Sequence, residues 1–115
     1  MCPMLTLACL YEETKNEKYL PYLNEWADFA LHGMTRTTEG GIQHKCTGCE
    51  NKEQLWDDTL YMTVMFMAKY GAIFGKKEFI EESEYQFLLH IKYLTDRNSG
   101  LWYHGWSFAR GDHFA

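Results

Sequence analysis

The pattern of apolar and polar positions predicts four helices, two of which lack a polar face. The first of these two covers Met4–Tyr11 and the second covers Leu60–Phe74, and both are apolar nearly all round. A helix of this kind is buried on most of its faces. We therefore expect both segments to be inner helices that touch neighbours on more than one side.

An amphipathic helix follows each apolar one. Between Leu20 and Met34, apolar side chains recur every three or four residues, as expected of a helix that is half exposed. The apolar face of the fourth helix is predicted to contain Ile80, Phe87, Leu88, Ile91 and Leu94. Its exposed face is predicted to contain Glu81, Glu82, Gln86 and Lys92.

The chain also divides into two similar repeats, approximately residues 1–46 and 47–106, within a single domain over 1–115. The loop Gly40–His44 of the first repeat aligns with Gly100–His104 of the second. Self-similarity of this kind indicates a repeat or toroidal architecture, and alternating inner and outer helices indicate an α/α barrel. A four-helix bundle fits less well, because each of its helices would carry a polar face.

Composition and charge exclude several classes of partner. The formal net charge is -5 and no run of Lys or Arg is present, so we expect no nucleic-acid binding. There is no run of about 18 apolar residues, so we expect no membrane span. The apolar N-terminus has no basic residue before it and no clear cleavage site, which predicts a cytoplasmic protein without a signal peptide.

A Cys-x-x-Cys pair, Cys46 and Cys49, follows His44 closely. A structural zinc site needs four ligands, and no second pair of this kind is present downstream. Reduced thiols in a cytoplasmic protein are the favoured interpretation. A small zinc module built on His44, Cys46 and Cys49 stays open as an alternative.

Candidate chemistry gathers in the loops that lead from outer to inner helices. His44, Asp58 and His104 all lie in such loops or directly after them, so we expect them at one rim. Carboxylates transfer protons and aromatic rings stack on sugar faces. Several aromatic side chains are expected at the same rim: Trp56, Trp102, Tyr103 and Trp106. The combination favours a sugar-binding site.

Structural roles compete with this interpretation. Asp57 and Asp58 open a helix, where an aspartate satisfies free N–H groups and suits the helix dipole. His44 and His104 could be loop imidazoles that bond only to backbone. Their matched positions in the two repeats favour a functional role.

Three segments together resemble glycoside hydrolase family 105, the unsaturated rhamnogalacturonyl hydrolases, which are related to the family 88 unsaturated glucuronyl hydrolases. They are Arg36–His44, Gln54–Met62 and Leu94–Trp106, and Ala109–Gly111 resembles the next stretch of that family's sequence. The resemblance covers nearly the whole chain, with the motifs in the family's order. It implies a six-hairpin (α/α)6 barrel, of which this chain would hold about two helical hairpins with short loop or β segments at one rim.

The resemblance also implies the reaction. Such enzymes hydrate the C4–C5 double bond of the unsaturated uronyl residue that a polysaccharide lyase leaves, which differs from displacement between paired carboxylates. The substrate would be a rhamnogalacturonan-derived unsaturated oligosaccharide from pectin, and no metal or cofactor is expected. Matched by motif, Asp58 is the expected general acid and base. Substrate-binding residues are expected at His44, His104, Trp106 and, at a variable position of the motif, Asp57.

The sequence departs from the family pattern in three places. The family has an aspartate loop before the segment that matches Met1, and an arginine expected to grip the substrate carboxylate after the segment that matches Ala115. Residues 46–49 also replace a plainer loop. We expect the chain to be part of a barrel, to be inactive alone and to self-associate through exposed inner helices. A non-catalytic helical-repeat binding module is the main alternative.

Overall fold

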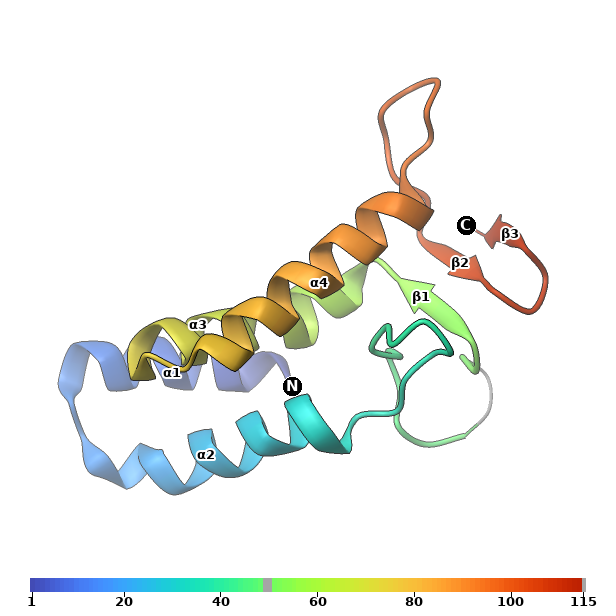
Figure 1. Cartoon of the computed structure of the whole chain (residues 1–115). Helices are drawn as coiled ribbons and strands as arrows, with labels where there is room; N and C mark the ends of the chain where they lie inside the picture. Colours follow the sequence, from blue (N-terminus) through green and yellow to red (C-terminus); the bar gives the residue numbers. More distant parts are fainter. Residues whose placement is uncertain (49–50, 115) are drawn as a thin grey trace. The chain divides into compact units, whose positions relative to one another are not determined.

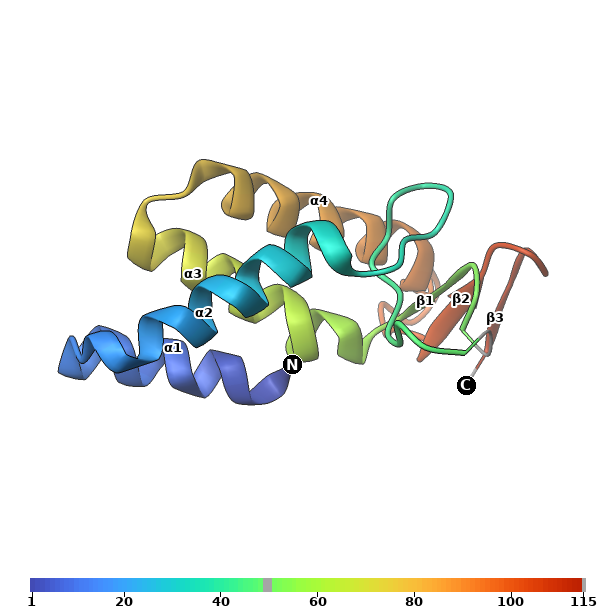
Figure 2. The same ribbon diagram turned by 90° about the horizontal axis from the view of Figure 1, so that it is seen from below.

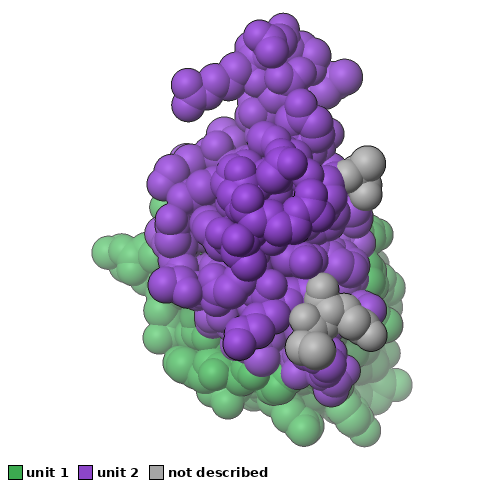
Figure 3. All heavy atoms as spheres, turned by 90° about the vertical axis from the view of Figure 1, so that its right-hand side faces the viewer, with its two compact units in different colours: residues 1–33, 61–84 green, residues 34–60, 85–115 purple. Residues whose placement is uncertain are grey.

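A computed structural model describes residues 1–48 and 51–114. Its residues fall into two compact units, shown in separate colours in Figure 3. Unit 1 comprises Met1–Gly33 and Tyr61–Glu84, and unit 2 comprises Met34–Leu60 and Tyr85–Ala115. Each unit therefore draws on both sequence repeats, and the proposed division into repeats 1–46 and 47–106 stays a prediction.

Unit 1 is helical (Figure 1). Its helices are α1 (Cys2–Thr14), the short 3-10 turn η1 (Glu17–Tyr19), α2 (Leu20–Asp28) and α3 (Met65–Phe74). The π-helical turn η2 (Phe29–Gly33) extends α2, and η3 (Leu60–Val64) leads into α3. Helix α1 packs against α3, and α2 packs against both of them, as Figure 2 also shows. The four predicted helices are therefore present, the fourth being α4 (Lys77–Leu94).

The ends of these helices follow from local chemistry. Pro3 and Pro21 lie in the first turns of α1 and α2, where the missing N–H group is not needed. Gly75 ends α3 with φ of 62°, a left-handed conformation that glycine adopts without steric cost. Gly71 lies inside α3, where a Cβ atom would come within 2.9 Å of Phe79, so the glycine permits close packing at this corner.

Helix α1 is less buried than its composition predicts. Only Ala8 is fully buried in it, and Leu10 is exposed. Helix α1 packs mainly against α2 and α3, and its remaining faces stay accessible in the described residues. Coverage of this helix on most faces therefore stays a prediction for a barrel that contains further helices. Helix α3 agrees better, since Phe66, Met67 and Tyr70 are buried.

Unit 2 holds a three-stranded antiparallel sheet in the order β1-β2-β3 (Figure 1). The strands are β1 (Gln54–Trp56), β2 (Gly105–Ser107) and β3 (Asp112–Phe114). Paired residues share a face of the sheet, and successive residues alternate between faces. Trp56, Gly105 and Phe114 therefore form one cross-strand row, and the row of Leu55 lies on the opposite face.

The buried face of α4 differs from the predicted one. Phe87, Leu88 and Ile91 are exposed, Leu88 by 66%, whereas Gln86 is fully buried. The buried positions of α4 recur at helical spacing, and several of them are polar, so the sequence pattern does not show them clearly: Phe79, Ser83, Gln86, Leu89, His90 and Leu94. The apolar pattern pointed to the wrong side of the helix because hydrogen bonding places an amide and an imidazole inside unit 2.

The two glycine loops that align in the sequence form similar hydrogen-bonded turns in unit 2. In the first, the Gly40 N–H bonds to the Thr37 carbonyl, and in the second the Gly100 N–H bonds to the Asp96 carbonyl, both at 2.8 Å. Both glycines have positive φ, 83° and 74°. The second turn holds one more residue than the first. Both loops then run directly into the candidate histidines.

Within residues 1–48 and 51–114, no helix is long and apolar enough to cross a membrane.

Candidate functional site

The candidate carboxylates are held where strand β1 passes into a helical turn of unit 2. Trp56 pairs with Gly105 of β2, and the next backbone N–H, that of Asp57, donates to the carbonyl of His104 at 2.9 Å. The Leu60 N–H then bonds to the Asp57 carbonyl at 3.2 Å and begins the helical turn. The sheet therefore fixes this segment beside the loop that carries His104.

Gly105 is required by the packing of this sheet. A Cβ atom at that position would lie 2.2 Å from the Phe114 ring, far inside contact distance. Without one, the Phe114 ring approaches both Trp56, at 6.4 Å between centroids, and His104, at 6.1 Å. The absence of a side chain at Gly105 thus allows the Phe114 ring to pack against Trp56 and His104.

His44 contacts the residue expected to be the general acid. Its Nδ1 lies 3.2 Å from Oδ1 of Asp58, and the same nitrogen lies 3.2 Å from Oγ1 of Thr59. The His44 side chain is mostly buried, with 17% exposed, whereas that of Asp58 is 47% exposed. The Asp58 carboxylate is therefore accessible to a ligand, and the mostly buried His44 imidazole contacts it from the protein side.

His104 makes the equivalent contact with the neighbouring carboxylate. Its Nδ1 lies 2.8 Å from Oδ1 of Asp57, and both side chains are 41% exposed. The same Asp57 oxygen accepts the Asp58 N–H at 2.8 Å. Asp57 thus serves as a cap for the start of the helical turn, in agreement with the capping interpretation of this residue.

The indole of Trp56 lies against both imidazoles. It stacks on His44 at 4.9 Å with 16° between the planes, and it lies 5.5 Å from His104 at 50°. We call the group of His44, Trp56, Asp57, Asp58 and His104 the Trp56 cluster. His44 contacts Asp58 and His104 contacts the adjacent Asp57, so the two histidines lie beside Trp56 together with the two carboxylates that they contact, and the roles of these residues stay a prediction.

Trp106 lies elsewhere. It pairs with Leu55 in β2, which places its side chain on the opposite face of the sheet from Trp56. There it packs 5.5 Å from Tyr93 and 4.8 Å from His113, and Tyr103 stacks on His113 at 4.0 Å. The expected grouping of Trp106 with Trp56 is therefore wrong, because strand alternation places the two indoles on opposite faces of the sheet.

The fold also brings two side chains of α4 to the site that the sequence did not identify. Gln86 is fully buried and bonds to the loop that precedes His44, and His90 is fully buried one turn later. Burial lowers the pKa of His90 from its ordinary value, while the carbonyls of Gln86 and Trp56 and the Asp57 carboxylate oppose this shift. A sequence signal existed, since both residues share the helical spacing of Phe79 and Leu94.

Among the described residues, no group of three or more His, Cys, Asp or Glu is placed to hold a metal ion. Cys46 has a free thiol whose sulfur lies 3.0 Å from that of Met34. Cys49, the third residue of the alternative zinc module, lies outside the described residues, so that alternative is not tested.

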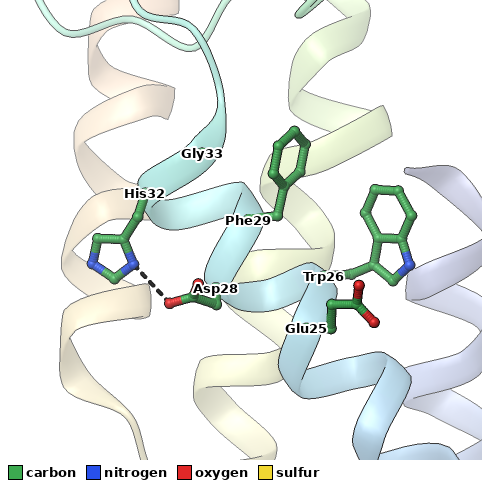
Figure 4. A pocket seen from close by; sticks show the side chains of 6 residues that line it. All are labelled: Glu25, Trp26, Asp28, Phe29, His32 and Gly33. Atoms are coloured by element: carbon green, nitrogen blue, oxygen red, sulfur yellow. Dashed lines mark hydrogen bonds and ion pairs between the residues drawn. The ribbon is translucent and has the colours of Figure 1, made fainter.

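Unit 1 has a hollow of its own along α2 and η2, with a volume of about 470 Å³. Figure 4 shows Trp26 and Phe29 on it, with a hydrogen bond between His32 and Asp28 of 3.0 Å. Both partners of this pair are largely exposed. One helix alone lines the hollow, and it holds no second carboxylate–histidine pair among the residues shown.

Comparison with known proteins gives this geometry a context. The model of Glycosyl Hydrolase Family 88 matches residues 1–115. The chain is 33% identical over 112 residues to the unsaturated rhamnogalacturonyl hydrolase YesR of Bacillus subtilis, covering 96% of this chain and 33% of that protein. The chain thus spans about a third of the length of this curated relative.

Solved structures agree. A possible member of the GH105 family from Klebsiella pneumoniae is 50% identical with a TM-score of 0.92, over 98% of this chain and 30% of that one. One from Salmonella enterica is 51% identical, with the same TM-score and coverage. A family 105 glycoside hydrolase of C. acetobutylicum is 32% identical with a TM-score of 0.79, over 91% of this chain and 28% of its own.

These matches confirm the resemblance that the three sequence motifs indicated, and the mostly helical fold agrees with the family 105 structures. Matching the family model from its first residue to its last, the chain belongs to glycosyl hydrolase family 88.

Proposed function

We propose that the chain supplies part of the active site of a hydrolase that acts on unsaturated uronyl oligosaccharides derived from rhamnogalacturonan. The observation that supports this most is the Trp56 cluster, in which two histidine–carboxylate pairs lie against one indole. The curated relative YesR is itself an unsaturated rhamnogalacturonyl hydrolase. Since the chain spans about a third of YesR, the activity belongs to a longer protein that contains these residues.

In this proposal Asp58 is the general acid and base. Its carboxyl group protonates C4 of the unsaturated uronyl residue, and the C4–C5 π electrons form the new C–H bond. Positive charge then develops at C5, where the ring oxygen stabilises it. Water adds at C5 and gives a proton back to Asp58. The resulting hemiketal opens by breaking the bond between C5 and the ring oxygen, which gives a ketone at C5 and a hemiacetal at C1. Breakdown of this hemiacetal to an aldehyde breaks the bond from C1 to the glycosidic oxygen and releases the rest of the sugar as an alcohol.

The contacts of Asp58 and Asp57 support this division of roles. Asp57 already accepts two hydrogen bonds, from His104 and from the Asp58 backbone, which commits it to holding the site together. Asp58 has the more exposed carboxylate and a mostly buried imidazole behind it. A general acid must reach the proton acceptor, so geometry favours Asp58 over Asp57.

His44 and His104 would bind the uronyl carboxylate and hydroxyls and orient the two aspartates. Trp56 offers a flat aromatic face to the sugar, and Lys45 lies 5.8 Å above that ring as a cation for an acidic ligand. The binding role predicted for Trp106 would require the sugar to reach the other face of the sheet, because the Trp106 side chain lies on the face opposite to Trp56.

The same proposal includes the architecture. The helical hairpins would be adjacent members of an (α/α)6 barrel, and the apolar sides of α1 would pack against further helices there. Exposure of Leu10 and the half-burial of Met4, Leu5 and Leu7 support this, since these side chains are apolar and incompletely covered.

Ligand binding to the 115-residue chain tests the proposal. An unsaturated rhamnogalacturonan disaccharide, titrated into chain labelled on its histidine rings, is expected to shift the NMR signals of His44 and His104. The saturated disaccharide is the control and should shift them less, because its C4 is tetrahedral. Shifts confined to other histidines, or none at millimolar ligand, would contradict the proposed site.

The alternative is a non-catalytic helical-repeat binding module, in which both aspartates act only as caps. The capping contacts of Asp57 favour it in part. It predicts saccharide binding with no consumption of the double bond in any longer protein that contains the chain. Loss of the double bond's ultraviolet absorbance distinguishes the two functions.

A further inference from the structure

Helix α4 presents polar side chains to the interior of unit 2 at two consecutive turns. Gln86 and His90 are both fully buried, although an amide and an imidazole lose hydration when they leave water. Hydrogen bonds to other groups offset part of this cost. Their partners therefore show what these residues hold in place.

Gln86 holds the loop that carries His44. Its Oε1 accepts the Ile42 N–H at 2.9 Å, and its Nε2 donates to the Gly40 carbonyl at 2.9 Å. One amide thus bonds to both sides of Gly41, which lies so close to the core that a Cβ atom would come within 2.3 Å of Leu55. The position of this loop is set by a side chain more than 40 residues away, as the separation of 44 residues for the first bond shows.

His90 lies one helical turn after Gln86, near the backbone of Trp56 and the Asp57 carboxylate. Its Nδ1 donates to the Gln86 carbonyl at 2.7 Å, and its Nε2 is buried without a hydrogen-bond partner among the described residues. The Trp56 carbonyl and the Asp57 carboxylate are near enough to influence its ionisation. The imidazole therefore lies beside the backbone that leads into Asp57 and Asp58.

We propose that Gln86 is a positioning residue for the Trp56 cluster, which holds the Gly40–His44 loop so that His44 stacks on Trp56 and meets Asp58. His90 supports Gln86 from the next turn of α4. The inference rests on the proposed function for its meaning in catalysis, but the geometry it describes can be measured without any turnover.

The stacking of His44 on Trp56 provides the measurement. At 4.9 Å and 16°, the indole ring current moves the His44 ring protons away from their usual NMR frequency. In Gln86→Leu, which keeps bulk but loses both hydrogen bonds, we expect most of this shift to disappear. The His104 signal should stay near its original position, because β2 and Asp57 hold the loop that carries it.

Gln86→Glu serves as the conservative variant. Its carboxylate still accepts from Ile42 but cannot donate to Gly40, so the His44 shift should lie between those of the original chain and Gln86→Leu. Glu84→Gln, an exposed change on the same helix, should leave the spectrum of His44 unchanged. If Gln86→Leu unfolds, the folded Gln86→Glu chain decides: an unmoved His44 signal overturns the proposal, and an intermediate one supports it.

Activity separates this inference from the proposed function. In a longer protein that contains the chain, Gln86→Glu should lower kcat and also raise KM, because a displaced His44 both misaligns Asp58 and loses its contact with the sugar. A protein without turnover would refute the proposed function while the NMR result still decides the role of Gln86. If the protein is active but the His44 NMR signal does not change when Gln86 is substituted, only the positioning role of Gln86 is refuted.

Discussion

Nδ1 of His104 lies 2.8 Å from Oδ1 of Asp57, across 47 positions of sequence. The Asp57 N–H meanwhile donates to the His104 carbonyl at 2.9 Å, so the two residues are joined through both backbone and side chain. This double connection ties the loop of the second repeat to the segment that carries Asp58. The Asp57 carboxylate thus holds the two segments together, while the carboxylate of the neighbouring Asp58 stays accessible.

Replacing Asp57 by Ala tests the structural role. The change removes the cap on the Asp58 N–H and the partner of His104, so we expect unfolding free energy to fall by about 1 kcal/mol. Urea denaturation followed by circular dichroism measures the loss. Asp57→Asn, which keeps an acceptor oxygen, should lose less. Equal stability of the original and Asp57→Ala chains would show that the contacts of Asp57 do not stabilise the fold.

The buried imidazole of His90 should make the stability of the chain depend on pH. Its pKa in the folded chain is lowered by burial, so the unfolded chain binds more protons than the folded one once pH falls below the ordinary histidine pKa. The contribution of His90 to stability is therefore retained at neutral pH and falls by at most about 1.4 kcal/mol per pH unit below about pH 6.5.

The variant His90→Gln should flatten that part of the curve, measured as urea unfolding free energy between neutral and mildly acidic pH. Ser83→Ala is the matched control, because Ser83 is also buried on α4 but does not titrate. It should shift the whole curve without changing its slope. If His90→Gln leaves the slope as steep as before, the buried imidazole is not its source.

Gly105→Ala should disrupt the sheet beneath the Trp56 cluster. The added methyl group would lie 2.2 Å from the Phe114 ring, and this overpacking should cost about 1–3 kcal/mol. A Gly105→Ala, Phe114→Leu double variant, with a smaller side chain opposite, should recover part of the loss. Thermal unfolding of both variants measures the difference, and an unaffected single variant would contradict the close approach.

Exposed apolar side chains on α4 predict self-association of the 115-residue chain. Leu88 and Ile91 lie one turn apart and are 66% and 46% exposed, and a contiguous apolar face of this kind favours contacts with other molecules. Sedimentation velocity should show the average mass rising with concentration, and Leu88→Lys should reduce that rise. Glu84→Gln is the control, and a monomer at every concentration would be the contrary result.

The sequence predicted the features that local pattern determines. Helices are present where apolar positions recur, and the aligned glycines Gly40 and Gly100 both have positive φ in the structure. The approach of His44 and His104 to Asp58 and Asp57 followed from loop order in the predicted topology and from the family motifs.

Features set by tertiary contacts were not predictable in the same way. The apolar side of α4 is exposed because Gln86 finds backbone partners in a loop far away in sequence, which no local periodicity records. Trp106 was grouped with Trp56 because spacing alone does not show the strand, and strand alternation then places the two indoles on opposite faces. The incomplete cover of α1 depends on neighbours rather than on its own sequence.

The most direct test of the central claim compares Asp58→Asn with Asp57→Asn in a longer protein that contains the whole chain and consumes an unsaturated disaccharide. Consumption of an unsaturated disaccharide is followed by loss of the ultraviolet absorbance of its C4–C5 double bond. Removing a general acid–base should lower kcat about 10²–10⁴-fold in Asp58→Asn, with a much smaller loss in Asp57→Asn. Turnover by Asp58→Asn close to that of the unmodified protein would contradict the role proposed for Asp58.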